Sequence, residues 1–426
     1  MAWCCAVHIF TWYFLLLPWG VGRATGMFFC VSQILYVKGL TMRVIKSIVL
    51  SALLVCGAAG TAFATNGLLL EGYGPVSHAM GGTSMAFDNG AAAMTNNPAT
   101  LGLAPEGNRI DIAVGMLRPN VRWDMGQGMS ERSDSRSFVM PAVGYVRRQG
   151  DWAYGIGAYA LGGMGTDYPD AGMYSQLVVG KVLLPIAYNI SDKLTVGGTL
   201  EYIKADMDLV MTDPQYGMRI FDFRDGSDFT GATSGWGVSG KLGITYKLHE
   251  RVTFGSAYQF KGELSDLTGD GARVKNLNMP ASWSAGFAVK PFENVMLTAD
   301  YTRIFWSDAM KTLHVSQGNI AMPLKQNWKD QDVLALGVAW DILPQLTLRG
   351  GVNFANNPIQ DNVVPLFPAI IRNHYTTGFG YRFNENHSVD ASFGYAPKVE
   401  VSNGAPFTGT VSHSQTTSQL MYSIKF

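Results

Sequence analysis

The chain is poor in charge, and it contains no cysteine after residue 56. Charged side chains make up 15% of the 426 residues and the formal net charge is zero, whereas an ordinary soluble domain is about 25% charged. Without a basic excess there is little to neutralise phosphates, which argues against a nucleic-acid-binding protein. The four cysteines are Cys4, Cys5, Cys30 and Cys56. The main body of the chain can therefore hold neither a disulfide framework nor a cysteine-ligated metal.

Residues 42–64 have the three parts of a secretory signal peptide. A basic segment, Arg43 to Lys46, precedes an apolar run from Ile48 to Ala59, and small residues occupy positions 62 and 64. This order is what translocation and signal peptidase cleavage require, so we predict cleavage after Ala64. A buried core helix is the alternative.

Residues 1–41 contain an uncharged stretch, Ala2 to Val21, which is long enough for a transmembrane helix of about 20 residues. A signal peptide that starts at its own methionine does not need such a helix. We interpret residues 1–41 as an upstream extension of the reading frame, with translation starting at Met42. A genuine N-terminal anchor is the alternative.

The chain after residue 108 shows alternation of period two and no long helical stripe. In Leu194 to Tyr202, for example, Leu200 and Tyr202 share one face while Thr199 and Glu201 share the other. Such alternation is typical of β-strands. Fourteen segments of this kind begin near Arg109, Ser137, Trp152, Val178, Leu194, Ser234, Val252, Ala281, Val295, Val333, Leu346, Asn373, His387 and Gln419.

The connections between these segments alternate between short turns and long loops. Short turns occur at Gln149-Gly150 and His249-Glu250, for example, and long loops span 208–232 and 396–418. An even strand count with this rhythm predicts a 14-stranded antiparallel transmembrane β-barrel over 109–426, because a closed barrel satisfies every backbone polar group in lipid. A soluble β-sandwich or propeller is the alternative. Aromatic residues near strand ends fit interfacial girdles: Trp152, Tyr188, Trp283, Trp306, Trp340 and Tyr381.

Residues 65–108 do not alternate and are rich in Gly and Ala. A short helix is expected from about Ala86 to Asn96, where Pro98 would stop it. Because a barrel of this size has a lumen wide enough to be plugged, we expect an N-terminal hatch folded inside the barrel. A flexible periplasmic tail is the alternative.

Several motifs resemble those of the FadL-type outer-membrane family (OmpP1/FadL/TodX), which transports long-chain fatty acids and aromatic hydrocarbons. The resemblance covers about residues 65–426. It rests on the order and spacing of Met80-Gly81-Gly82, Asp88, Asn97-Pro98-Ala99, Gly163 to Tyr168, Leu184 to Tyr188, Met279 to Trp283, Leu348 to Gly351 and Asn357-Pro358. It implies a 14-stranded barrel with a hatch, in the outer membrane of a Gram-negative bacterium, where the hydrophobic ligand leaves sideways through a gap at a kink in the third strand.

The same resemblance implies which residues form the site. A ligand pocket and hatch would include Thr65, Asn66, Gly67, Asn97, Pro98 and Ala99, and the lateral opening would fall at Gly162 and Gly163. Family members often have an aromatic residue before the second of these glycines, and this chain has Gly162 instead. A general porin or a purely structural barrel is the alternative function.

An acidic ligand would need a cation in the lumen. Alternation places Arg349, Lys241 and Lys204 on or near inward faces, and Arg349 is the first candidate because a guanidinium can bind a carboxylate through two hydrogen bonds. Pairing with inward acids such as Glu201 or Asp300 is the structural alternative.

We find no pattern for an enzyme, a metal or a cofactor: no histidine has an evident serine partner, and the glycine motifs lack the spacing of nucleotide loops. The expected partners are a hydrophobic ligand, outer-membrane lipids and detergent-like molecules, and the barrel-assembly machinery, with no nucleic acid. We expect a monomer.

Overall fold

A computed structural model describes residues 66–426, except 214–215, 228, 360–362 and 405–406. The predicted extension 1–41, the predicted signal peptide 42–64 and Thr65 lie outside the described residues, and the domain boundaries proposed there stay predictions. In the described part, no helix combines the length and the hydropathy needed to cross a membrane.

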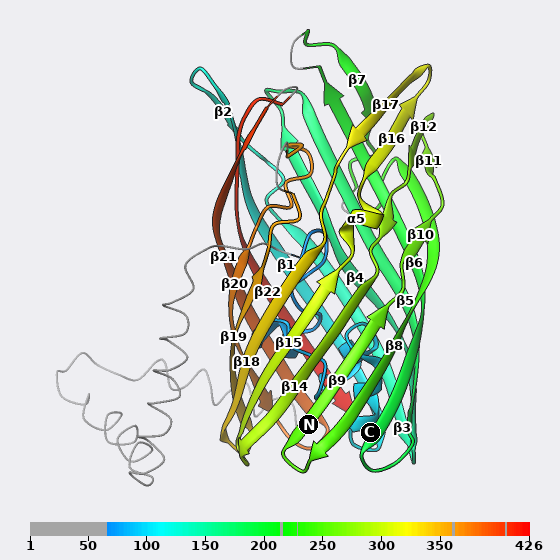
Figure 1. Ribbon diagram of the computed structural model, residues 1–426, viewed down its shortest axis with the longest axis vertical. Coiled ribbons are helices and arrows are strands. Elements are labelled where there is room, and N and C mark those ends of the chain that lie inside the picture. Colours follow the sequence, from blue (N-terminus) through cyan, green and yellow to red (C-terminus); the bar gives the residue numbers. More distant parts are fainter. Residues whose placement is uncertain (1–65, 214–215, 228, 360–362, 405–406) are drawn as a thin grey trace, which may run out of the picture. The chain divides into compact units, whose positions relative to one another are not determined.

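Fourteen strands of the described part form a closed antiparallel barrel (Figure 1), as predicted. They are β1 (Gly107–Gly126), β3 (Phe138–Gln149), β4 (Trp152–Tyr168), β5 (Met173–Asn189), β6 (Leu194–Thr212), β8 (Thr233–His249), β9 (Val252–Gln259), β14 (Ser282–Phe292), β15 (Val295–Ile304), β18 (Gln331–Leu343), β19 (Leu346–Ala355), β20 (Asn373–Arg382), β21 (His387–Asn403) and β22 (Gly409–Lys425). The first and last of them close the ring, with a ladder running from Arg109↔Lys425 to Asp124↔Thr410.

The outer face of the strands is apolar, and the inner face carries buried polar and charged residues as well as apolar ones. On β6, Leu200 is 61% exposed while its neighbour Glu201 is 0% exposed, and on β5 the apolar Leu184 is exposed while Lys181 is buried. A soluble protein shows the opposite distribution. The inversion is that of a barrel whose outer surface faces lipid.

Short turns and long connections lie at opposite ends of the barrel, and the start of β1 and the end of β22 lie at the short-turn end (Figure 1). Short strands extend the long connections. They are β2 (Met129–Arg132), β7 (Arg219–Phe223), β10 (Gly262–Leu264), β11 (Leu267–Gly269), β12 (Ala272–Lys275), β13 (Asn278–Met279), β16 (Thr312–Gln317) and β17 (Ile320–Lys325), together with helix α5 (Trp306–Ala309).

Two barrel strands begin earlier than the alternation predicted. β22 begins at Gly409 rather than near Gln419, and β5 begins at Met173 rather than Val178. The first half of β22 carries polar residues on both faces, with Ser412 and Ser414 alternating with His413 and Gln415. Where both faces of a strand are polar, the sequence does not alternate between apolar and polar residues, and this pattern cannot locate the strand.

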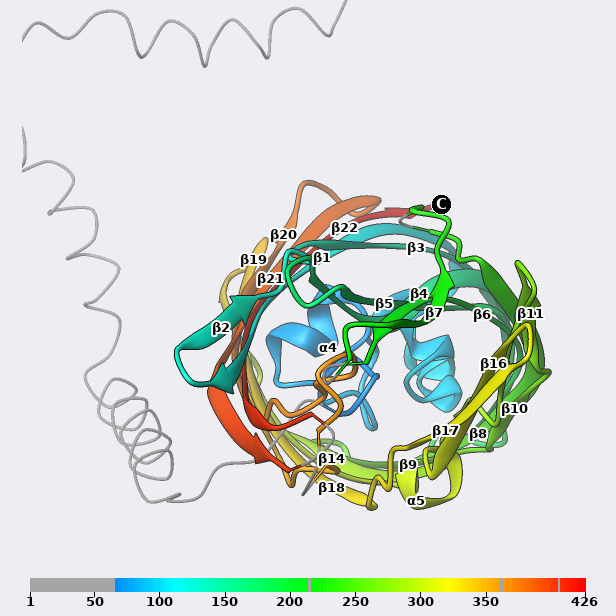
Figure 2. The same ribbon diagram turned by 90° about the horizontal axis from the view of Figure 1, so that it is seen from above.

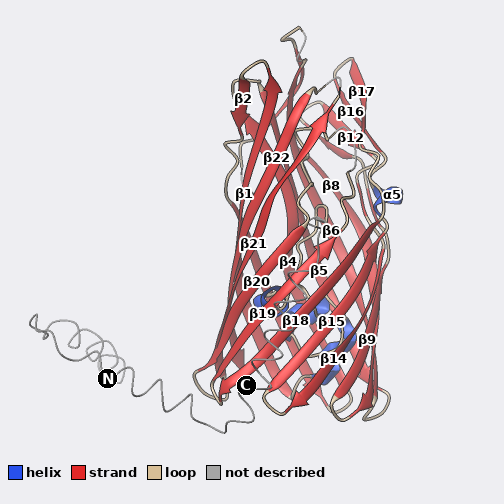
Figure 3. Cartoon of the chain, turned by 60° about the vertical axis from the view of Figure 1, so that its left-hand side comes forward, coloured by secondary structure: helices blue, strands red, loops and turns tan. Residues whose placement is uncertain are grey.

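Residues 66–106, here called the N-terminal segment, fold inside the barrel (Figure 2). They contain α4 (Pro75–Ala79) and the 3-10 helices η1 (Gly90–Met94) and η2 (Pro98–Leu103), which lie in the half of the barrel nearer the short turns (Figure 3). The single helix expected from Ala86 to Asn96 is wrong in extent. Asn97 instead caps the start of η2, since its side chain accepts a hydrogen bond from the Ala99 amide at 3.1 Å.

Polar side chains of the wall hold this segment in place. Lys241 on β8 donates to the carbonyl oxygens of Thr95 and Asn96 at 2.5 and 3.1 Å. The carboxylate of Asp300 on β15 accepts from the amides of Ser84 and Met85 at 2.6 and 3.0 Å. The inward polar face of the barrel is therefore matched to the backbone of the N-terminal segment.

Candidate functional site

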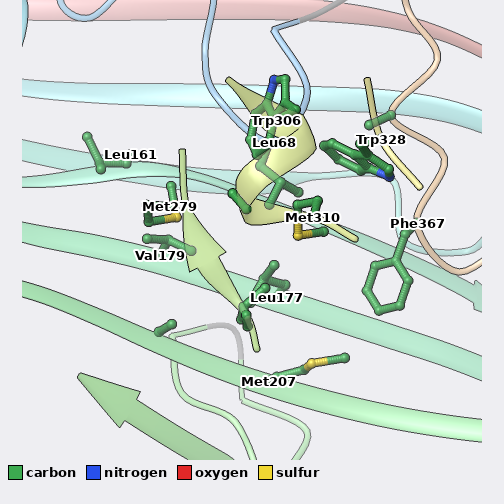
Figure 4. Packing of buried hydrophobic residues seen from close by; sticks show 14 of the residues in the cluster. Leu68, Leu161, Leu177, Val179, Met207, Met279, Trp306, Met310, Trp328 and Phe367 are labelled. Carbon is green, nitrogen blue, oxygen red and sulfur yellow. The ribbon is translucent and has the colours of Figure 1, made fainter. Parts of the chain in front are cut away.

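A large cluster of buried apolar side chains joins barrel strands, the long connections and the N-terminal segment, and Figure 4 shows part of it. Trp306 on α5 and Trp328 after β17 pack edge to face with ring centroids 4.8 Å apart. The cluster continues through Phe367 and Met207 to Leu161 on β4. Trp306 is 0% exposed, and its indole packs against Gly67 of the N-terminal segment and against Trp328, so its expected place in the interfacial girdle is wrong.

The start of the N-terminal segment reaches this cluster. Leu68 is 4% exposed and belongs to it, and Gly67 lies against both indoles, because a Cβ there would be 2.5 Å from Cζ2 of Trp306 and 2.9 Å from Cζ3 of Trp328. Gly67 also has a φ of +70°, so glycine suits the position for two reasons. Asn66 and Gly67 thus lie beside the apolar cluster, and Thr65 lies outside the described residues.

The wall has a gap between β3 and β4. Their ladder ends at Ala142↔Tyr159, although β3 extends back to Phe138 and β4 runs on to Tyr168. The strands meet again only through the residues before β3, where the Asp134 amide donates to the Asp167 carbonyl at 2.8 Å. We call the unpaired stretch, 135–141 against 160–166, the window.

A β-bulge shapes one edge of the window. The register between β4 and β5 shifts between Ala160 and Gly162, so Leu161 is the extra residue and its side chain is 1% exposed. A Cβ on Gly162 would be 2.3 Å from the Leu68 carbonyl oxygen, and one on Gly163 would be 2.3 Å from the Leu177 carbonyl oxygen. Both predicted glycines therefore border the window, and Gly162 abuts the N-terminal segment.

A cavity of about 50 Å³ lies directly behind the window. Its walls combine residues of the N-terminal segment, the window, β1, β22 and the connection before β20. They are Gly67, Leu68, Leu69, Leu70, Leu117, Pro119, Val121, Phe138, Gly162, Gly163, Met164, Gly165, Pro368, Ala369, His413 and Gln415. Apart from the last two, these are apolar or small residues, so the cavity suits an apolar occupant.

The predicted residues Asn97, Pro98 and Ala99 lie elsewhere. Asn97 donates to the Ile244 carbonyl of β8 at 3.3 Å, and a Cβ on Gly197 of β6 would be 2.6 Å from the Ala99 amide nitrogen. The three residues anchor the N-terminal segment against β6 and β8, and the structure does not bring them to the window.

The predicted carboxylate-binding cations already have partners. Arg349 on β19 donates to Asp390 on β21 at 2.8 Å, and Lys241 binds backbone carbonyls of the N-terminal segment. Lys204 points outward and pairs with Asp206 at 3.0 Å, so its expected inward position is wrong. Arg349 and Lys241 therefore have structural roles.

Glu71 is buried between two histidines. Its Oε1 lies 2.7 Å from Nε2 of His78, and its Oε2 lies 3.9 Å from Nε2 of His374 on β20. Burial alone would raise the pKa of Glu71, but the charges of His374 and His78 and the hydrogen bond from His78 lower it to about 2. His78 Nδ1 also lies 2.8 Å from Oγ of Ser392 on β21, a serine partner that the sequence pattern did not predict.

A family model described as outer membrane protein transport protein (OMPP1/FadL/TodX) matches residues 52–424. The chain belongs to this family. It is therefore a protein of the outer membrane, and the family is one of transport proteins rather than enzymes.

Solved structures show the same barrel. The toluene transporter TodX of P. putida superposes with a TM-score of 0.74 at 26% identity, covering 84% of this chain and 99% of TodX. The toluene transporter TbuX of Ralstonia pickettii gives a TM-score of 0.68 at 28% identity, with the same shares covered.

Curated relatives match over shorter stretches. A 47 kDa outer membrane protein of Pasteurella multocida is 25% identical over 206 residues, which are 42% of this chain and 48% of the relative. An uncharacterized Chlorobium limicola protein is 49% identical over 85 residues, 20% of this chain and 41% of the relative. The chain thus spans less than half the length of these relatives.

Several residues of the site could not be picked from the sequence. Trp328, Phe367 and Leu161 belong to long connections or to the bulge, where no alternation marks the inward face. The presence of large apolar residues in stretches expected to be exposed loops is the one feature of the sequence that could have identified them.

Proposed function

We propose that the chain takes up small hydrophobic molecules, which bind in the apolar cluster and leave sideways into the membrane through the window. One observation carries the proposal: the window between β3 and β4 backs directly onto the cavity lined by Leu68 and Phe138, and that cavity adjoins the buried cluster. A general porin or structural barrel needs neither feature.

A sideways exit suits such a ligand for a physical reason. Each CH₂ group gains about 0.8 kcal/mol by staying out of water, so an aqueous pore would oppose the passage of a hydrocarbon. An apolar pocket connected to the bilayer interior would not.

We favour a neutral ligand, such as an aromatic hydrocarbon, over a fatty acid. Arg349 and Lys241, the predicted partners of a carboxylate, are engaged by Asp390 and by backbone carbonyls. An unpaired carboxylate buried in the cluster would be costly. Two relatives are named as toluene transporters, and the chain CymD, 25% identical, is named a monoaromatic hydrocarbon channel.

Uptake requires a rearrangement. The cavity behind the window, at about 50 Å³, is too small for an aromatic ring, since a cavity of about 150 Å³ binds benzene. Residues 67–70 line it, and three of them are leucines, while the backbone hydrogen bond between Leu69 and Asn66 lies within the segment itself. Their displacement would join the cavity to the cluster.

The test is uptake of labelled toluene and labelled oleate by cells that lack their own transporter. We expect the chain to accelerate toluene uptake, and to accelerate oleate uptake much less. Faster oleate uptake would overturn the neutral-ligand assignment. A large ion conductance of the intact protein in planar bilayers, without ligand uptake, would instead support the general porin.

A further inference from the structure

At the bulge on the edge of the window, one residue is paired with neither of the two neighbouring strands. Leu161 is the extra residue of the bulge, and the ladder to β3 has already ended at Tyr159. A backbone polar group facing an apolar site is costly unless it finds another hydrogen-bond partner. The structure supplies one: the hydroxyl of Tyr73 donates to the Leu161 carbonyl at 3.1 Å.

Tyr73 belongs to the firmly held part of the N-terminal segment. Its own carbonyl accepts a hydrogen bond from the Asn96 side chain at 3.0 Å, and the carbonyl of Asn96 is in turn bound by Lys241 on β8. Burial raises the pKa of Tyr73, so the hydroxyl keeps its proton and acts as a donor. The hydrogen bond to Leu161 thus joins an anchored residue to the edge of the window.

The ring of Tyr73 also occupies the inner side of the window. It lines a small cavity of about 30 Å³ together with Met140 of β3 and with Tyr159 and Ala160 of β4. These residues lie at the corner where the two strands separate. Tyr73 therefore contacts both the bulge and the point where β3 and β4 separate.

We propose that Tyr73 is a positioning residue that keeps the window open. By satisfying the Leu161 carbonyl from inside the lumen, it makes the bulge stable without pairing to β3. If the hydroxyl is lost, the shortest way to satisfy that carbonyl is for β4 to straighten and pair with β3, which closes the window. This inference rests on the proposed lateral release.

The test is Tyr73→Phe, which removes the hydroxyl and keeps the ring. We expect uptake of labelled toluene to fall about tenfold. The lost hydrogen bond leaves the Leu161 carbonyl unsatisfied while the window is open, and this lowers the population of the open window by about that factor. Binding in the interior cluster, followed by the fluorescence of its tryptophans, should change less than twofold. Amide hydrogen exchange of peptides covering 135–141 and 160–166 should slow, because the two strands gain hydrogen bonds.

Tyr145→Phe is the matched control. It removes another partly buried hydroxyl, which donates to Asn108 at 2.9 Å on the paired part of β3, and it should leave uptake and exchange at the window unchanged. Unaltered exchange at the window in Tyr73→Phe would overturn the role of Tyr73. If even the unmodified protein takes up no toluene, the proposed function fails, whereas slower exchange in Tyr73→Phe would still support the positioning role.

Discussion

At the scale of single residues, Gly162 is one of the points where the wall lies directly against the N-terminal segment. A Cβ there would lie 2.3 Å from the Leu68 carbonyl oxygen, and its φ is +153°. Gly162→Ala should therefore displace Leu68 or the strand and destabilise the fold by about 1–3 kcal/mol. Chemical unfolding in detergent measures the loss.

Gly180→Ala on the neighbouring strand is the control for this change. Its added Cβ would meet only the Tyr159 carbonyl oxygen at 3.7 Å, an ordinary contact. Equal unfolding midpoints for the two variants would contradict the close approach at Gly162.

Glu71 gives the N-terminal segment a dependence on pH. Its pKa is lowered from 4.5 to about 2, so the carboxylate stabilises the fold fully above pH 4.5 and loses this contribution as the pH falls toward 2. The melting temperature should therefore drop between pH 5 and pH 2 more steeply in the natural chain than in Glu71→Gln.

The exposed Glu106 provides the comparison for that experiment. Glu106→Gln should keep the steep acid dependence of the natural chain, since Glu106 lies on the surface near the start of β1. If Glu71→Gln is as steep as Glu106→Gln, the carboxylate of Glu71 does not stabilise the segment.

At the scale of elements, the width of the window depends on which side chains of β3 point into it. Phe138 lies across the opening, because a Cβ on Gly165 would be 3.2 Å from its Cζ atom, whereas Val139 points to lipid and is 46% exposed. Phe138→Ala should widen the window. We expect uptake of two-ring naphthalene, relative to toluene, to rise several-fold.

Val139→Ala removes a neighbouring apolar side chain from the outer face and should leave the naphthalene-to-toluene ratio as it is. If Phe138→Ala and Val139→Ala give the same ratio, then Phe138 does not limit the size of what passes.

The sequence predicts a strand correctly where one face of that strand contacts lipid. It does not predict the parts of strands that extend beyond the lipid. The alternation from Leu194 to Tyr202 located β6, because lipid and lumen demand opposite side chains. The early part of β22, from Gly409, has polar residues on both faces, so the alternation predicts a loop there. Trp306 looked like a girdle residue, since only the folded connection shows that it turns inward.

At the scale of the whole molecule, the site arises from parts that are far apart in the sequence. Gly162 could be predicted from the resemblance, but its contact with Leu68 and the packing of Gly67 on Trp306 join the N-terminal segment to two distant regions. No local pattern encodes such contacts. Tyr73 had no distinguishing feature in the sequence, because its role depends on a bulge formed elsewhere.

The hydrogen bonds that close the barrel are separate from those that hold the N-terminal segment. The ladder between β1 and β22 closes the ring through strand pairing alone. The side chains of wall residues such as Asp111, Lys241 and Gln419 form hydrogen bonds with the backbone of the N-terminal segment. These wall groups are polar and can be solvated when the lumen fills with water. Removing the segment should therefore spare the barrel and open it.

Deletion of residues 65–99 is the test at this scale. The truncated protein should still show the heat-dependent gel mobility of a folded barrel, and single channels in planar bilayers should conduct ions, while the intact protein should show little conductance. An equally low conductance of both proteins would mean that the long connections alone seal the lumen. Because Trp306 and Phe367 lie in those connections, the added deletion of 306–328 would then identify the seal.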